Sequence, residues 1–204
     1  MAQQVFPTKA NLLDQKRSLA LAQQGYELMD RKRNILVREI VRLIDRAGTI
    51  QGEISAAYQE AYASLRRANI TLGSVGEFAR SVPVEHGLTV SYHSVMGVEL
   101  PTLRLVPSAP TAFYYGMEST NSMLDIAYLK FGEVKALTVE LAEVESSVFR
   151  LGEAIHKTQK RANALNNIQI PLFHENIKYI GDVLEEKERE DFSRLKVVKK
   201  QKEG

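Results

Sequence analysis

The sequence predicts a mainly all-α chain: a long antiparallel two-helix coiled coil with a small middle segment that contains a short β-hairpin. Apolar residues recur in alternating steps of four and three over about 8–72, and again over about 118–198. Four of the six prolines and five of the twelve glycines lie between these stretches. Because proline and glycine break helices, we divide the chain into an N-terminal helix (1–72), a middle segment (73–117) and a C-terminal helix (118–204).

The first stretch has the more regular pattern. Thr8 follows Pro7 and suits an N-cap, and stepping from Leu12 to Ala61 meets fifteen positions, of which thirteen are apolar. A 3–4 repeat held over seven heptads predicts a narrow apolar stripe on a supercoiling helix. The principal seam residues expected here are Leu19, Tyr26, Met29, Leu36, Ile40, Leu43 and Ile54.

The last stretch repeats the pattern less cleanly, with eight apolar residues among twelve positions from Leu124 to Ala162. Its principal seam residues are Phe131, Val134, Leu141, Val148 and Ile155. Its polar members, with those of the first stretch, should set the register or contact a partner: Gln15, Arg33, Thr138, Glu145 and Gln159. Pro171 predicts either a bend near Ile170 or two helices that abut there.

The middle segment has period-two alternation. Leu88, Val90 and Tyr92 alternate with polar residues, which predicts a strand, and residues 98–105 can supply the return strand around Pro101. Pro101 should lie on an edge or at a bend, and a short helix fits about 75–82. The segment either caps the helix pair or docks a partner. Docking is favoured because a coiled coil does not need 45 residues to reverse direction.

Composition excludes several classes of function. The chain has no cysteine, and its 27 basic and 25 acidic residues are too balanced to indicate nucleic-acid binding. It has no apolar run of about 20 residues, so it should not insert in a membrane, and its N-terminus does not resemble a secretory signal. The four histidines lack metal-ligand spacing and no phosphate-binding glycine loop is present. We therefore predict no catalytic, cofactor-binding or metal-binding residue.

Two charged clusters and a glycine pair allow alternative interpretations. Arg31, Lys32 and Arg33 either form part of a solvated face or contact acidic loops of a surrounding partner. The acidic and basic run from Glu185 onward is explained largely by helix stabilisation through i,i+4 pairs and the helix dipole. Gly48 and Gly52, four apart on one face, mark either local softness or close approach of another chain.

Several motifs, in order along nearly the whole chain, resemble those of the D subunits of V-type and A-type rotary ATPases. The N-terminal ones are Pro7-Thr8-Lys9, Asn11-Leu12-Leu13, Lys16-Arg17, Gly25-Tyr26 and Arg31-Lys32-Arg33. In the middle stand Met96-Gly97-Val98 and Pro101. Toward the C-terminus stand residues 163–167, Ile170-Pro171, Leu184-Glu185-Glu186, Glu188-Arg189-Glu190 and Arg194-Leu195-Lys196.

The resemblance implies the central-stalk axle of an ATPase or ATP synthase, a non-catalytic subunit that transmits rotation between the catalytic ring and the membrane ion-translocating ring. The implied partners are the A and B subunits, the small F subunit and a C-type (d-type) stalk subunit, on the cytoplasmic side of the membrane as a peripheral part of the complex. Expected partner contacts are Arg31, Lys32, Arg33, Met96, Gly97, Val98, Glu186, Arg189 and Arg194. The alternative is a coiled-coil scaffold or adaptor unrelated to rotation.

Overall fold

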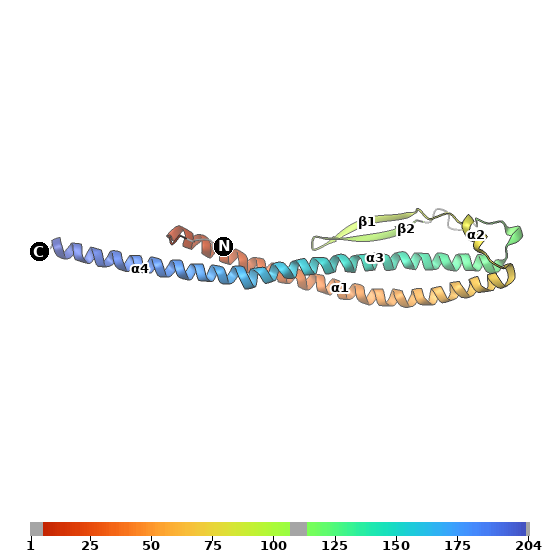
Figure 1. The fold of residues 1–204 in the computed structure, drawn as a ribbon, viewed down its shortest axis with the longest axis horizontal. Coiled ribbons are helices and arrows are strands. Elements are labelled where there is room, and N and C mark those ends of the chain that lie inside the picture. Colours follow the sequence, from red (N-terminus) through yellow and green to blue (C-terminus); the bar gives the residue numbers. More distant parts are fainter. Residues whose placement is uncertain (1–5, 107–113, 203–204) are drawn as a thin grey trace. The chain divides into compact units, whose positions relative to one another are not determined.

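A computed structural model describes residues 6–106 and 114–202. It confirms the mainly helical fold with one hairpin in the middle of the chain (Figure 1). In chain order its elements are α1 (Lys9–Leu72), α2 (Gly76–Ser81), β1 (Leu88–Val95), β2 (Val98–Leu105), the 3-10 turn η1 (Met117–Ser119), α3 (Ser122–Ala164), the π turn η2 (Leu165–Gln169) and α4 (Ile170–Lys202). They form two compact units: Met1–Asn34 with His156–Gly204, and Ile35–Ile155.

In the first unit, the N-terminal part of α1 pairs with the end of α3 and with α4. Lys9 forms an ion pair with Glu188 at 2.8 Å, and the Arg33 guanidinium donates to the Gln159 amide oxygen at 2.8 Å. Since the partner's number falls as the number along α1 rises, the two helices run antiparallel. Ile180 is fully buried in this unit.

In the second unit, the rest of α1 pairs with α3 in the same antiparallel sense. Glu60 forms an ion pair with Lys130 at 3.1 Å, and near the turn the Asn121 side chain donates to the Thr71 hydroxyl at 2.6 Å. Gly73 ends α1 in the left-handed conformation, with φ of 75°, and its N–H donates to the Asn69 carbonyl.

The α1 seam lies where the apolar repeat predicts it. None of the fifteen positions from Leu12 to Ala61 is exposed. Those that are nearly or fully buried are Ala22, Leu36, Ile50 and Ala61. The two polar members are also accommodated: Arg33 bonds Gln159, and Gln15 accepts a bond from the Asn176 side chain at 3.5 Å.

The α3 seam differs from the expected one. The repeat predicts Thr138 and Glu145 within it, but both are exposed. Past Val134 the helix buries positions in steps of three then four, so the seam is Leu137, Leu141, Val144, Val148, Leu151, Ile155, Thr158 and Ala162, each buried or half-buried. Leu141, Val148, Ile155 and Ala162 belong to both the expected and the observed seam. Each of the other four expected positions is replaced by the residue that precedes it in the sequence. Stepping four then three chooses Thr138 and Glu145, whereas burial favours their apolar neighbours Leu137 and Val144.

The junction near Pro171 is a single π turn between α3 and α4. Pro171 has no N–H to donate to the Asn167 carbonyl, so a regular α-helix would lose a hydrogen bond and place the ring against that carbonyl. The π turn Leu165–Gln169 widens the backbone at that point. Of the two expected forms, the structure therefore has abutting helices, joined without a loop.

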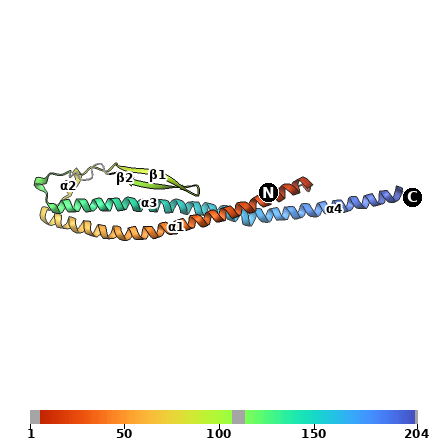
Figure 2. The same cartoon turned by 180° about the vertical axis from the view of Figure 1, so that it is seen from behind.

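The hairpin and α2 complete the second unit. The two strands pair antiparallel from Leu88↔Leu105 to Val95↔Val98, and Met96 and Gly97 form the two-residue turn with positive φ of 51° and 74°. Seen from both sides, β1 and β2 lie alongside α3 (Figure 1 and Figure 2). Pro101 lies within β2, which is an edge strand of this two-stranded sheet.

Candidate functional site

A shared apolar core holds the hairpin on the helix pair. Leu100 of β2 packs with Leu36 of α1 and Leu151 of α3, and all three are 0–1% exposed. Around them pack Ile40, Leu43, Val95, Val98, Ala154 and Ile155. Full burial of side chains of this size stabilises a fold by about 1.5–3 kcal/mol each. The hairpin is therefore an integral part of the second unit.

Polar bonds from α3 hold the outer edge of β2. The backbone N–H of Leu103 donates to Glu143 Oε2 at 2.7 Å, and Arg150 donates to the Glu99 carbonyl at 3.1 Å. The Arg150 guanidinium also lies over the Tyr92 ring, 5.2 Å from its centroid. Glu143 and Arg150 thus bond two backbone groups of β2 that a third strand would otherwise bond.

The turn of the hairpin presents Met96. The Met96 side chain is 45% exposed. Its backbone has a positive φ, which most non-glycine residues avoid. Val98, the third expected contact of this motif, is half-buried and packs into the core around Leu100. Met96 and Gly97 are therefore accessible at the turn, whereas Val98 contributes chiefly to packing.

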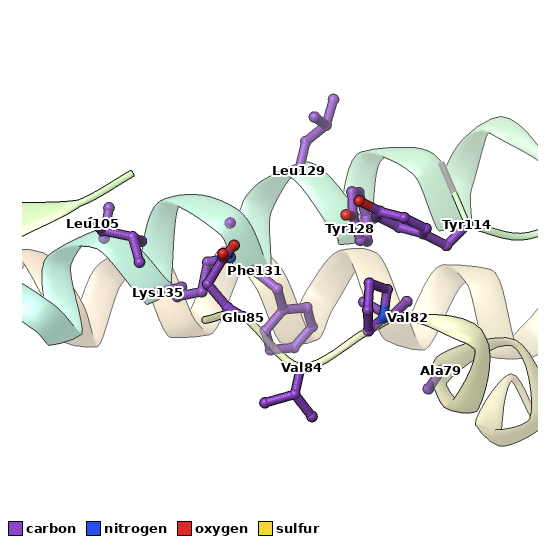
Figure 3. A pocket seen from close by; sticks show the side chains of 13 residues that line it. Ala79, Val82, Val84, Glu85, Leu105, Tyr114, Tyr128, Leu129, Phe131 and Lys135 are labelled. Atoms are coloured by element: carbon purple, nitrogen blue, oxygen red, sulfur yellow. The ribbon is translucent and has the colours of Figure 1, made fainter. Parts of the chain in front are cut away.

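A cavity of about 730 Å³ lies between the segment 79–85 and α3 (Figure 3). Apolar and aromatic side chains make up most of its wall, among them Tyr128 and Phe131. Its charged members pair with each other, because Lys135 Nζ lies 3.0 Å from Glu85 Oε2. The lining therefore offers mainly apolar contact, together with one charge pair.

The basic residues of α1 do not share one role. Arg31 is exposed and lies 3.6 Å from Glu27 one turn earlier. The Arg33 side chain is 31% exposed, pairs with Asp30 and donates to Gln159 across the helix pair. Lys32 is half-buried. Arg33 is thus committed to contacts inside the first unit, and Arg31 is the more accessible charge.

The charged residues of α4 stand on an exposed helix. Arg189 pairs with Glu185 at 2.6 Å, Arg194 lies 3.5 Å from Glu190, and Glu186 is exposed. Such pairs contribute only about 0.3–0.5 kcal/mol each. They leave the side chains accessible to another chain.

Three ionic or polar contacts tie neighbouring elements and shift the pKa of their members. The hydrogen bond from Lys9 lowers the pKa of Glu188, and the same bond raises the pKa of Lys9. A hydrogen bond to Glu140 raises the pKa of Arg46. Burial, and then a 2.8 Å hydrogen bond to Asp125, raises the pKa of Tyr115.

Sequence reasoning misses Glu143 and Arg150 as site residues. In the sequence, nothing distinguishes either residue from the other charged residues of the same helical stretch. Their role depends on which way the hairpin folds back, and local periodicity does not encode that direction. The alternation around Tyr92 predicts its strand, but not its position under Arg150.

In residues 6–106 and 114–202, acidic and histidine side chains nowhere gather in a group of three or more that could hold a metal ion. No helix in these ranges combines the length and apolar character that a bilayer crossing needs. The accessible features are surfaces: the hairpin, its turn, and the charged faces of α1 and α4.

Comparison with known proteins finds relatives that match nearly the whole chain. Residues 11–200 match the family of ATP synthase D subunits. The chain is 45% identical to the V-type ATP synthase D subunit of Thermotoga neapolitana, over 96% of this chain and 97% of that protein. It is 39% identical to the A-type ATP synthase D subunit of Pyrococcus horikoshii, over 95% and 92% respectively. The corresponding protein of Methanopyrus kandleri is 35% identical, over 96% and 85%.

Proposed function

Since the chain belongs to the family of ATP synthase D subunits, we propose that it is the central-stalk axle of a V-type or A-type ATPase or ATP synthase. It transmits rotation between the ring of A and B subunits and the membrane ion-translocating ring, and it does no chemistry itself. The observation that carries the proposal is the match over residues 11–200 to a family of ATP synthase subunits.

The helix pairing supports a mechanical role. An axle transmits torque only if its helices do not slide past each other, and here apolar burial and polar cross-links oppose sliding in each unit. Arg33–Gln159 and Lys9–Glu188 link the helices of the first unit. Arg46–Glu140 and Glu60–Lys130 link those of the second.

The accessible charges suggest how torque is passed on. In this proposal Arg31 and Lys32 on α1, with Glu186, Arg189 and Arg194 on α4, contact the surrounding A and B subunits. The middle segment 73–117, with Met96 and Gly97, docks rotor partners, for which the small F subunit and the C-type (d-type) subunit are the candidates. The chain then sits on the cytoplasmic side of the membrane, as a peripheral part of the complex.

The absence of cysteine allows a direct test of rotation. Arg31→Cys supplies a single exposed thiol, which can form a reversible disulfide with a cysteine placed in one A or B subunit of the reconstituted complex. Oxidation should abolish ATP turnover and reduction should restore it, since a linked axle cannot turn. The cysteine-free chain in the same ring, under the same oxidant, is the control. Undiminished turnover in fully cross-linked complexes would rule out rotation of this chain.

A further inference from the structure

The hydrogen-bond pattern of the hairpin determines which backbone groups of β1 point away from β2. The Val106 N–H donates to the Gly87 carbonyl at 2.9 Å, which marks this pair as hydrogen-bonded. In an antiparallel ladder every second pair is of this kind, so Thr89, Ser91, His93 and Val95 bond to β2. The N–H and C=O groups of Val90, Tyr92 and Ser94 therefore point outward.

The opposite edge of the sheet is partly occupied by side chains of α3. On β2 the outward groups belong to Glu99, Pro101, Leu103 and Leu105. Arg150 and Glu143 bond Glu99 and Leu103, and Pro101 has no N–H to expose. The sheet thus has one partly protected edge, which rests on α3, and one edge formed by β1.

The β1 edge is open within the described part of the chain. No hydrogen bond there reaches the outward backbone groups of Val90, Tyr92 or Ser94, and the Val90 and Tyr92 side chains are 52% and 57% exposed. Natural edge strands are usually protected by charged residues, prolines or bulges. β1, with the sequence LTVSYHSV, has no charged residue and no proline, and its eight residues pair without a bulge.

We propose that the open edge of β1 binds an extended strand of another subunit of the ATPase complex and so becomes the middle strand of a three-stranded sheet. This inference rests on the proposed function, because a family of ATP synthase subunits acts in an assembly. Outward donors and acceptors that repeat at every second residue match another backbone, as in β-augmentation. With no charge on β1, the incoming strand is expected to carry apolar or neutral polar side chains.

Amide hydrogen exchange, read residue by residue, tests the proposal on the full chain alone and in the purified complex. The ladder amides of Ser91 and His93 should be protected in both states and serve as internal standards. The amides of Val90 and Tyr92 should exchange quickly in the free chain and at least about a hundredfold more slowly in the complex. Equal exchange of Val90 and Tyr92 in the two states overturns the proposal.

Val90→Pro removes one outward donor without removing a ladder bond. Pro101, opposite Tyr92, shows that this hairpin accepts proline at an outward-pointing position. The variant should lose the protection of Tyr92 in the complex while Ser91 keeps its protection in the free chain. Val90→Thr, which keeps the N–H and a β-branched side chain, is the matched control and should behave as the native chain. If Val90→Pro unfolds the hairpin, Val90→Lys provides the same test, since a charge on the edge disfavours strand pairing.

The remaining outcomes separate this inference from the proposed function. If the chain purifies with A and B subunits but Val90 and Tyr92 stay unprotected, the strand proposal alone fails. If the chain does not purify with them, the proposed function fails as well. If the isolated chain forms a dimer in sedimentation that Val90→Pro abolishes, and the complex shows no added protection, then the strand that binds β1 comes from a second copy and the proposal is wrong.

Discussion

At the scale of single residues, Gly87 is the position where the hairpin tolerates least change. A Cβ built on Gly87 would lie 1.8 Å from the Val106 carbonyl oxygen, and Val106 is the partner in the first bond of the ladder. Gly87→Ala should therefore open the base of the hairpin and cost on the order of 1–3 kcal/mol in the free energy of unfolding. Urea unfolding, with exchange of the Val106 amide, measures both effects.

Gly48→Ala is the matched control for that substitution. Gly48 lies inside α1, and a Cβ there meets nothing within 4 Å. Alanine favours the helix over glycine, so this variant should gain roughly 0.5–1 kcal/mol. Equal stability changes at the two glycines would contradict the close approach at Gly87.

The ion pair between Lys9 and Glu188 gives a pH-dependent prediction at the same scale. Lys9 holds the pKa of Glu188 below its ordinary value of 4.5, so the stabilising contact is present at neutral pH and is lost as the pH falls through that lowered value. Raising the pH breaks it only above the raised pKa of Lys9. Carboxyl NMR titration should show the pKa of Glu188 returning to its ordinary value in Lys9→Ala. An unchanged titration would exclude the contact in solution.

At the scale of elements, the register of α3 is tested by two neighbouring positions. Leu151 is fully buried between α1 and the hairpin, whereas Glu145 is exposed. Leu151→Ala should cost about 2–5 kcal/mol, because it leaves a cavity where three elements meet. Glu145→Ala should change stability by less than about 0.5 kcal/mol. Urea midpoints of the two variants give the comparison, and a reversed order would restore the register expected from the sequence.

The same elements show what the sequence could and could not predict. The α1 seam was predictable because thirteen of its fifteen positions are apolar, so one stripe stood out. On α3 apolar residues also lie next to the expected positions, as Val144 does beside Glu145. Which of two neighbours is buried depends on how α1 and the hairpin pack against α3. The hairpin was predictable from alternation and from Met96-Gly97. Its contacts with Glu143 and Arg150 were not, because they connect segments about 40 and 50 residues apart whose meeting depends on packing.

At the scale of the whole molecule, α1 contributes residues to both compact units, as α3 does. If the chain is an axle, a break within α1 should separate events at the catalytic ring from events at the membrane. Ile40→Pro introduces such a break: proline removes a backbone hydrogen bond and costs about 3 kcal/mol or more inside a helix. Ile40 also packs against the core of Leu36, Leu100 and Leu151, so the substitution loosens the hairpin's support as well.

The expected result is uncoupling. Reconstituted complexes with Ile40→Pro should keep a substantial part of their ATP hydrolysis but lose most ion pumping per ATP, because torque applied at one end of a broken helix pair is dissipated before it reaches the other. Ile40→Ala trims the same side chain and keeps the helix, so it should lower stability but keep the pumping ratio. Simultaneous measurement of ATP turnover and ion uptake in vesicles gives that ratio. A native ratio for Ile40→Pro, in complexes shown to contain the variant chain, would mean that coupling does not pass through α1.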